Sequence, residues 1–307
     1  MKYIDKSYSQ EDINNIADSF LTKGFVKINS IFTDEFVAYI KSKTNESIDA
    51  PVDKYQSGFN RIAFDLFIND DVVLGLMNDD EFRNIMSTVT ERKLFFTQAL
   101  AFELEKNKST GFPWHIGTQS FGYQQASDFG CTIWMPLDEI NTSTQKGGMA
   151  YVPEDVISGR FMYEDADPAI AKHIEERHDL SENPELGDYL KLRDGILNDG
   201  SMKTLLDHFG VEDNYCLGDI LLFNKNVIHR SVKLEEGKLD HRAAFVMRFI
   251  ESDSTYDKKR ALSLDFPRKL FDYKGCTSFH LDVCDIDKEL ISNSNYFKDH
   301  DTRHLTV

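Results

Sequence analysis

The chain has 307 residues, of which 41% are hydrophobic, so it is long enough to bury a sizeable core and is predicted to be folded. Its 35 basic and 52 acidic side chains give a net charge of −17, which argues against nucleic acid and anionic membrane surfaces as partners. No apolar run approaches the roughly 20 residues of a membrane-spanning helix, and the first residues lack the apolar segment of a signal peptide. The four cysteines form no C-x-x-C pair, so we expect reduced thiols in a cytoplasmic protein.

The amino-terminal third is predicted to be mainly helical. Ser9 can cap a first helix that carries apolar side chains on one face and stops at Gly24. The segment 25–29 then alternates like a short strand. Thr33 can cap a second helix, and a third helix is predicted around residues 79–90.

The rest of the chain changes to a strand pattern. Apolar segments with strand propensity occupy residues 94–104, 129–137, 148–153, 216–224, 227–234 and 243–251. Helices followed by closely spaced strands indicate an α+β protein with one antiparallel core, and the spacing fits a double-sheet jelly roll.

One segment, residues 163–213, interrupts the strands. It holds fourteen Asp and Glu against five Lys and Arg, a net charge of −9, and includes helical stretches such as IAKHIEERHDL. We interpret it as an insertion over one end of the sheets. Its role stays open between a solvated pair of surface helices and a mobile lid.

Two of the nine histidines, His115 and His229, stand where an apolar segment begins or ends. At such positions a rigid sheet can hold a side chain in the orientation that a metal ligand needs. Taken singly, each histidine fits a hydrogen-bonded core residue better than a metal ligand. Arg242 follows His229 by 13 residues and Arg248 by six more, an even step that places both arginines on one face of a strand. Arginines on a buried face require anions, which local carboxylates or a ligand could provide.

The ordered motifs of the chain resemble a known family. They are WH-x-G, TIW, GG-x-A-x-VP, GDILLF and H-x-S, followed by an arginine 13 residues beyond the second histidine. This order is similar to that of the phytanoyl-CoA dioxygenase superfamily of Fe(II)- and 2-oxoglutarate-dependent oxygenases, over roughly residues 10–250. The resemblance implies one domain, residues 1–307, with a double-stranded β-helix (cupin-like) core, flanking helices and residues 163–213 as a lid-like insertion.

The chain departs from the hydroxylases of that family at one position. They bind iron through His-x-Asp and a distal histidine, whereas this chain has His115-Ile116-Gly117. Glycine at the third position resembles the aliphatic halogenases, in which chloride takes the place of the carboxylate. A halide carries the same charge as the missing carboxylate, and the absent side chain leaves room for it. A site that has lost its metal is the alternative.

The resemblance also implies the cofactors and the residues that hold them. The cofactors are Fe(II), 2-oxoglutarate, chloride and O2. The residues are His115 and His229 for the metal, Arg242, Ser231 and Trp134 for 2-oxoglutarate, and Gly117, Arg248 and Thr132 for chloride.

Within the halogenases the chain is most similar to the halogenase domains of curacin- and jamaicamide-type polyketide synthases. This implies an acyl carrier protein as partner and a 3-hydroxy-3-methylglutaryl thioester as substrate. Basic residues for docking are Lys258, Lys259 and Arg260, or Arg268 and Lys269.

Two other functions remain open at this stage. A hydroxylase of the same superfamily would take a carboxylate from elsewhere, with Glu103 and Asp128 as candidates. A non-catalytic binding protein on a β scaffold would need no iron.

Overall fold

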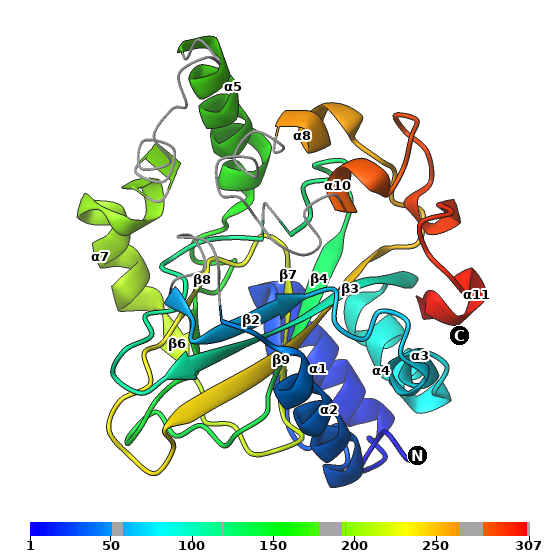
Figure 1. Ribbon diagram of the computed structural model, residues 1–307, viewed down its shortest axis with the longest axis vertical. Helices are drawn as coiled ribbons and strands as arrows, with labels where there is room; N and C mark the ends of the chain where they lie inside the picture. The colour runs from blue at the N-terminus through cyan, green and yellow to red at the C-terminus, as the bar shows by residue number, and fades with distance from the viewer. Residues whose placement is uncertain (51–57, 118–119, 178–191, 194, 264–278, 306–307) are drawn as a thin grey trace.

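A computed structural model of the chain describes residues 1–50, 58–117, 120–177, 192–193, 195–263 and 279–305 (Figure 1). Its helices are α1 (Gln10–Lys23), α2 (Asp34–Ser47), α3 (Asp71–Met77), α4 (Asp80–Thr90), the π-helix η2 (Met162–Ala166), α5 (Asp167–Arg177), α7 (Gly200–Phe209), α8 (Lys258–Ser263), α10 (Phe279–Asp282), the 3-10 helix η3 (Ile291–Asn293) and α11 (His300–Arg303). Its strands are β1 (Phe25–Ile28), β2 (Arg61–Phe64), β3 (Leu94–Glu105), β4 (Gly130–Pro136), β5 (Met149–Tyr151), β6 (Val211–Glu212), β7 (Ile220–Asn224), β8 (His229–Ser231), β9 (His241–Glu251) and β10 (His304–Leu305). None of the helices described is both long and apolar enough to cross a membrane.

The first helices form where their capping residues predict them. The Ser9 hydroxyl accepts a hydrogen bond from the Asp12 amide and closes a capping box at the start of α1. The helix ends at Gly24, whose φ of 76° is the left-handed conformation that glycine adopts at low cost. At the start of α2 the Thr33 hydroxyl accepts a hydrogen bond from the Phe36 amide.

Two antiparallel sheets form the β core. In the part of the chain described, the larger sheet runs β1-β7-β4-β9-β3-β10, with β2 also paired to β3, and the smaller sheet runs β6-β5-β8. All strand pairs that join these elements are antiparallel, which confirms the predicted α+β class with an antiparallel core.

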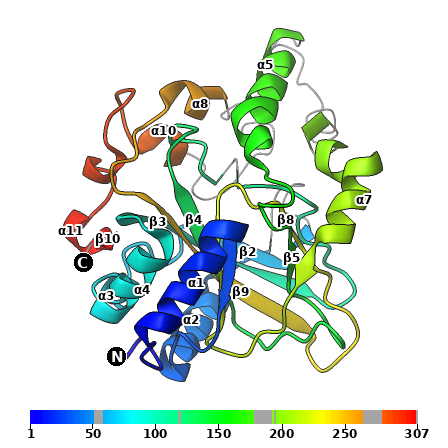
Figure 2. The ribbon, with the colours of Figure 1, turned by 180° about the vertical axis from the view of Figure 1, so that it is seen from behind.

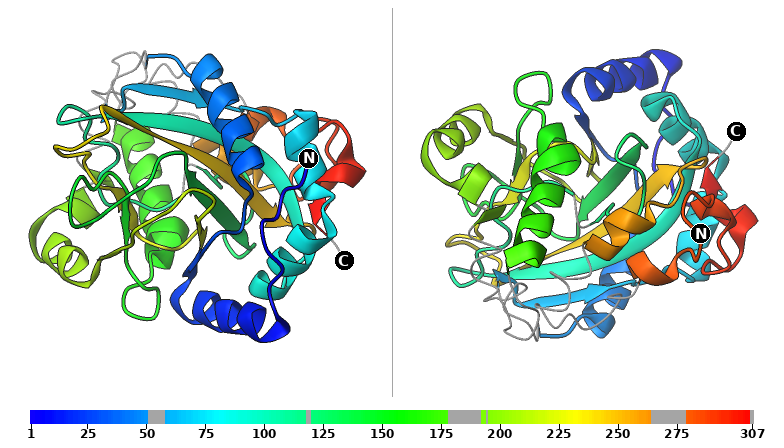
Figure 3. Two further views of the ribbon diagram at one scale, coloured as in Figure 1. Left: turned by 90° about the horizontal axis from the view of Figure 1, so that it is seen from below. Right: turned by 90° about the horizontal axis from the view of Figure 1, so that it is seen from above.

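The larger sheet separates two environments. Along β9 the odd-numbered residues from Ala243 to Phe249 pack in one hydrophobic cluster with the side chains of helices α1 to α4. Ala244 and Val246 lie in a second cluster with Trp134, on the face turned toward the smaller sheet. Figures 2 and 3 show these helices gathered on one side of the sheet, while α5 and α7 stand at the other end of the molecule. The period of two residues therefore directs Arg242 and Arg248 to the inner face, as the even step predicts.

The predicted strands are all present, although some are shorter than expected. The segment predicted at 227–234 contributes only His229–Ser231 to a strand, because its ladder with β5 has just three residue pairs. The sequence patterns missed β2 and the short helix α3. The described cysteines, Cys131, Cys216 and Cys284, are free thiols.

The insertion at residues 163–213 contains helices, as predicted, in α5 and α7; residues 178–191 and 194 lie outside the described part. Its first residue, Tyr163, is fully buried and donates a hydrogen bond to the Phe121 carbonyl at 2.5 Å. The Tyr163 ring also contacts two cations, with Lys225 Nζ at 4.2 Å and Arg260 Cζ at 4.4 Å from its centroid. These contacts attach the start of the insertion to the β core.

Arg260 corrects one prediction. It is only 9% exposed and donates to the Tyr163 carbonyl at 2.8 Å, so its role is to hold the insertion. It is therefore not a surface residue for docking a carrier protein. The other pair proposed for docking, Arg268 and Lys269, lies outside the described residues.

Candidate functional site

The two histidines singled out in the sequence meet in space. His115 and His229 form an isolated antiparallel bridge, in which each backbone N–H donates to the carbonyl of the other at 2.9 Å. Their ring centroids lie 4.2 Å apart. The segment that carries His115 thus extends the smaller sheet beyond β8, and the sheet backbone brings together two imidazoles that are 114 residues apart in sequence.

The tautomer of both rings is set by the backbone. His115 Nδ1 lies 2.8 Å from the Pro113 carbonyl and His229 Nδ1 lies 2.8 Å from the Val227 carbonyl, so each Nδ1 carries the hydrogen and donates it. Each Nε2 then presents a lone pair. A histidine that ligates a metal is commonly oriented by such a bond from its other nitrogen.

Burial keeps these imidazoles neutral. Burial lowers the pKa of His229 to about 4, and burial, followed by the neighbouring His229, holds the pKa of His115 well below its usual range. Neutral imidazole is the form that binds a metal.

The described residues provide no third ligand from a carboxylate or thiol. No group of three His, Cys, Asp or Glu side chains suited to a metal occurs among them. Gly117, the third residue of the His115-Ile116-Gly117 motif, has no side chain, and a Cβ there would lie 3.2 Å from Phe121 Cδ2.

Glu103 and Asp128, the carboxylates predicted as metal ligands of a hydroxylase, both bind other groups. The prediction is therefore wrong for both residues. Glu103 accepts hydrogen bonds from Arg61 at 3.0 and 2.6 Å, on the face of β3 opposite the histidines. Asp128 accepts from the Thr255 backbone amide at 2.8 Å and so fastens a loop.

A buried cationic side chain, Arg242, lies on the inner face of the larger sheet. Arg242 is 0% exposed, and none of its three guanidinium nitrogens has a hydrogen-bond partner among the residues that the structure describes. Trp134 is 1% exposed, and its indole N–H likewise has no hydrogen-bond partner in the described part of the chain. The Arg242 Cζ lies 5.5 Å from the Trp134 ring centroid and 5.8 Å from that of Phe102. Burial lowers the pKa of Arg242 to about 10, since the positive charge is removed from water without a bonded anion.

Unpaired buried donors are costly, and two of them side by side indicate a ligand that accepts from both. A carboxylate has the charge and the acceptor atoms for this task. Ser231, predicted to join the pocket, accepts a hydrogen bond from the Phe112 amide at 3.1 Å and keeps its hydroxyl hydrogen for another acceptor.

Two more polar residues lie side by side on the inner face of the larger sheet. Thr132 on β4 lies directly opposite Arg248 on β9. After burial and the Val227 carbonyl, the charge of Arg248 is the smallest of the causes that act on the pKa of His229, which places Arg248 on the side of the sheet that faces the histidine pair. Two of the three residues predicted to hold chloride, Arg248 and Thr132, are therefore direct neighbours on the inner face of the larger sheet, and the third, Gly117, lies two residues beyond His115.

The insertion reaches the site through Trp114. The Asn198 side chain accepts from the Trp114 backbone amide at 2.9 Å and donates to its carbonyl at 2.8 Å, while the Trp114 indole donates to Asp207 at 2.9 Å. Because Trp114 precedes His115, these bonds tie the insertion to the chain beside the histidine pair.

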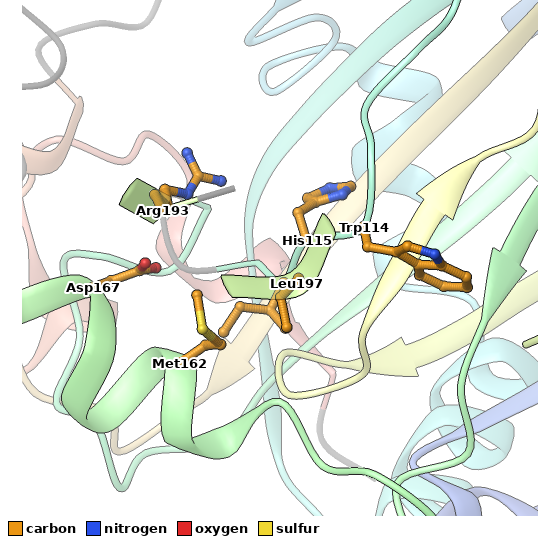
Figure 4. A pocket seen from close by; sticks show the side chains of 7 residues that line it. Trp114, His115, Met162, Asp167, Arg193 and Leu197 are labelled. Carbon is orange, nitrogen blue, oxygen red and sulfur yellow. The ribbon is translucent and has the colours of Figure 1, made fainter. Parts of the chain in front are cut away.

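A small pocket lies between the insertion and His115. Its lining includes Met162, Leu197, Asp167 and Arg193 from the insertion side (Figure 4). Asp167 is 1% and Arg193 is 5% exposed. Sequence patterns missed both charged residues, since they stand in a uniformly charged segment where no periodicity distinguishes buried positions.

The donor set fits a metal with a dicarboxylate co-substrate. Two neutral imidazole nitrogens suit iron, and the unpaired guanidinium and indole N–H suit a carboxylate held some distance from the metal.

Comparisons with known proteins agree on the fold. No protein-family model and no curated protein sequence matches the chain. Among solved structures it is similar to the non-heme alpha ketoglutarate dependent epimerase SnoN from nogalamycin biosynthesis, with 12% identity over 81% of this chain and 86% of that one and a TM-score of 0.56. The carbocyclase SnoK from nogalamycin biosynthesis (12% identity, 81% and 86% covered, TM-score 0.53) and the apoform of EctD from S. alaskensis (14%, 84% and 86%, TM-score 0.52) are also similar. At these identities the likeness concerns the fold, and it confirms the predicted double-stranded β-helix.

Proposed function

We propose that the protein is a non-haem Fe(II)- and 2-oxoglutarate-dependent oxidoreductase. The observation that carries this proposal is the histidine pair on the smaller sheet, with both Nε2 atoms available, together with the buried Arg242 guanidinium on the larger sheet, which has no hydrogen-bond partner among the described residues. The description of SnoN and SnoK as alpha ketoglutarate dependent enzymes supports it, because they share the fold.

In this proposal His115 and His229 hold Fe(II). Arg242 and the Trp134 indole bind the far carboxylate of 2-oxoglutarate, with the Ser231 hydroxyl as a further donor. Iron bound with 2-oxoglutarate and O2 supplies the oxidising chemistry that removes hydrogen from an aliphatic carbon. The protein's own residues position the reactants and exclude water from the pocket.

The finer proposal is that the enzyme is a halogenase. Gly117 leaves the position of a carboxylate ligand without a side chain, and the described residues offer no replacement carboxylate beside the histidines. Chloride then restores the missing negative charge. Arg248 and Thr132 are the neighbouring residues proposed to hold it.

The proposed substrate is an acyl group on an acyl carrier protein in polyketide biosynthesis, such as a 3-hydroxy-3-methylglutaryl thioester. Of the basic residues considered for docking, Lys258 and Lys259 are the exposed ones within the described chain. The insertion at 163–213 is proposed to act as a lid over the site. Its hydrogen bonds to Trp114, the residue before His115, support this proposal because they bring the insertion next to the histidine pair.

Two measurements test these proposals in sequence. An anaerobic absorption spectrum with Fe(II) and 2-oxoglutarate should show a charge-transfer band; its absence would favour a non-catalytic binding protein. Mass spectrometry of the product formed in chloride, in bromide and without halide should then show chlorinated and brominated products. A hydroxylated product in all three would identify a hydroxylase.

A further inference from the structure

The smaller sheet separates the two histidines from the residues next to them in the chain. Tyr151 on β5 lies directly opposite His229, and it belongs to the hydrophobic cluster between the two sheets. Ala150 lies opposite Arg230, and it packs in a different cluster together with Trp114. Because side chains alternate along a strand, the histidine pair points to the inner face of this sheet, and Trp114 and Arg230 lie on its outer face.

Trp114 and Arg230 contact each other on that outer face. Arg230 Cζ lies 5.1 Å from the centroid of the Trp114 ring, a distance at which a guanidinium is attracted to an aromatic face. Trp114 precedes His115, and Arg230 follows His229. A group that fixes these two side chains therefore also fixes the two backbone segments that carry the imidazoles.

Asp207 on α7 contacts both of these side chains. Its Oδ1 accepts a hydrogen bond from the Trp114 indole at 2.9 Å and lies 4.0 Å from Arg230 Nε. Its Oδ2 accepts from Lys203, one helical turn earlier. The bond from Lys203, followed by that from Trp114, lowers the pKa of Asp207, so that the side chain is a carboxylate at neutral pH.

The chain after α7 adds two contacts on the same face. Gly210 follows the helix, and a Cβ at this position would lie 2.9 Å from Trp114 Cη2, so the absence of a side chain lets the helix end approach the indole. Glu212 Oε1 lies 3.8 Å from Arg230 Nη2. The end of the insertion thus packs against Trp114 and Arg230 together.

We propose that Asp207 is a positioning residue of the metal site, which holds the segments of His115 and His229 in register from the outer face of the sheet. This inference rests on the proposed function, because it concerns the same two imidazoles. Without the carboxylate, fewer molecules hold both imidazoles in place at once. The apparent Fe(II) Kd then rises in inverse proportion to that fraction.

The experiment is an anaerobic calorimetric titration of the whole chain with Fe(II). Asp207→Ala should raise the Fe(II) Kd by roughly three- to tenfold, the worth of one hydrogen bond. Asp207→Asn keeps an oxygen that can accept the indole hydrogen, so its Kd should stay within about twofold of the wild type. Trp114→Phe removes the donor of the same bond and should act like Asp207→Ala. The double variant should be no weaker than either single variant, because both lose one shared interaction.

A matched control is Lys203→Met. It removes the same ion pair from α7 as Asp207→Ala does, but it keeps the bond between Asp207 and Trp114. Its Fe(II) Kd should stay within about twofold of the wild type, since an ion pair on a helix surface contributes little. The 2-oxoglutarate Kd of the iron-saturated protein should be the same in every variant, because Arg242 lies on the larger sheet.

The outcomes separate two failures. If the wild type binds Fe(II) and folded Asp207→Ala binds it equally well, the role of Asp207 is wrong and the proposed function stands. Asp207→Asn or Lys203→Met as weak as Asp207→Ala would also overturn the role, because both variants keep an acceptor for the indole. Should Asp207→Ala not fold, a wild-type Fe(II) Kd in Trp114→Phe would have the same meaning. A wild type that does not bind Fe(II) would refute the proposed function and this role with it.

Discussion

Replacing Arg242 by methionine should have opposite effects on the free protein and on ligand binding. The arginine is 0% exposed and its guanidinium nitrogens have no hydrogen-bond partner among the described residues, so the free protein keeps a buried positive charge without a bonded anion there. Methionine is similar in length and carries no charge. The variant should therefore be more stable than the wild type without ligand and should bind 2-oxoglutarate poorly.

The size of the first effect follows from the pKa of Arg242. Burial lowers it to about 10, and at 1.36 kcal/mol per pKa unit the shift corresponds to roughly 3 kcal/mol. The variant loses the contacts of the cation with Trp134 and Phe102, worth about 0.5–2 kcal/mol together. We expect a net gain of about 1–3 kcal/mol in the free energy of unfolding.

The second effect has the opposite sign. Loss of one partner of a buried ion pair costs about 3–5 kcal/mol, or two to four decades in Kd. At 100 times its Kd, 2-oxoglutarate should stabilise the wild type by about 2.7 kcal/mol, whereas the variant should gain almost nothing at that concentration.

The assay is chemical denaturation of the Fe(II)-loaded protein under anaerobic conditions, with and without 2-oxoglutarate. Arg61→Met is the matched control, because Arg61 is paired with Glu103 on the outer face. It should destabilise the protein and keep the full effect of 2-oxoglutarate. Suppose that Arg242→Met is less stable than the wild type and that 2-oxoglutarate stabilises it as much as it stabilises the wild type. This result would refute the proposal that Arg242 is an unpaired buried cation that binds 2-oxoglutarate.

Three further outcomes are expected. His115→Ala and His229→Ala should each abolish Fe(II) binding in calorimetric titrations, because each removes one of two imidazole ligands; a variant that retains wild-type affinity would contradict the ligand assignment. Gly117→Asp should still bind iron but lose chlorination, measured by product mass, while Gly117→Ala should keep part of it, reduced because its methyl group lies 3.2 Å from Phe121. Burial lowers the pKa of Lys225 to about 7, so the unfolded chain binds more protons above that pH and stability rises with pH. We compare the free energy of unfolding of the wild type with that of Lys225→Met. The difference should increase in favour of the wild type by up to about 1.4 kcal/mol per pH unit between pH 7 and 9. A difference that stays constant would show that folding does not change the protonation of Lys225.

Features with local causes were predictable from the sequence. The hydroxyl of Ser9 and the glycine at position 24 determine where α1 begins and ends, because capping involves only the adjacent turn. The even spacing of Arg242 and Arg248 places both on one face of β9 for the same reason, since side chains alternate along any strand.

The tertiary structure decided which residues meet. The bridge between His115 and His229 joins segments 114 residues apart, and the partner of Glu103 became evident only when β2 paired with β3. A bulge at Thr97 reversed the facing of β3 and brought Gln98 to Arg248, although the sequence there reads as one uninterrupted apolar strand. Spacing along a chain specifies which side of an element a residue occupies, but strand register and burial depend on contacts between distant segments. For this reason the sequence could indicate the chemistry of the site, while its polar environment had to come from the fold.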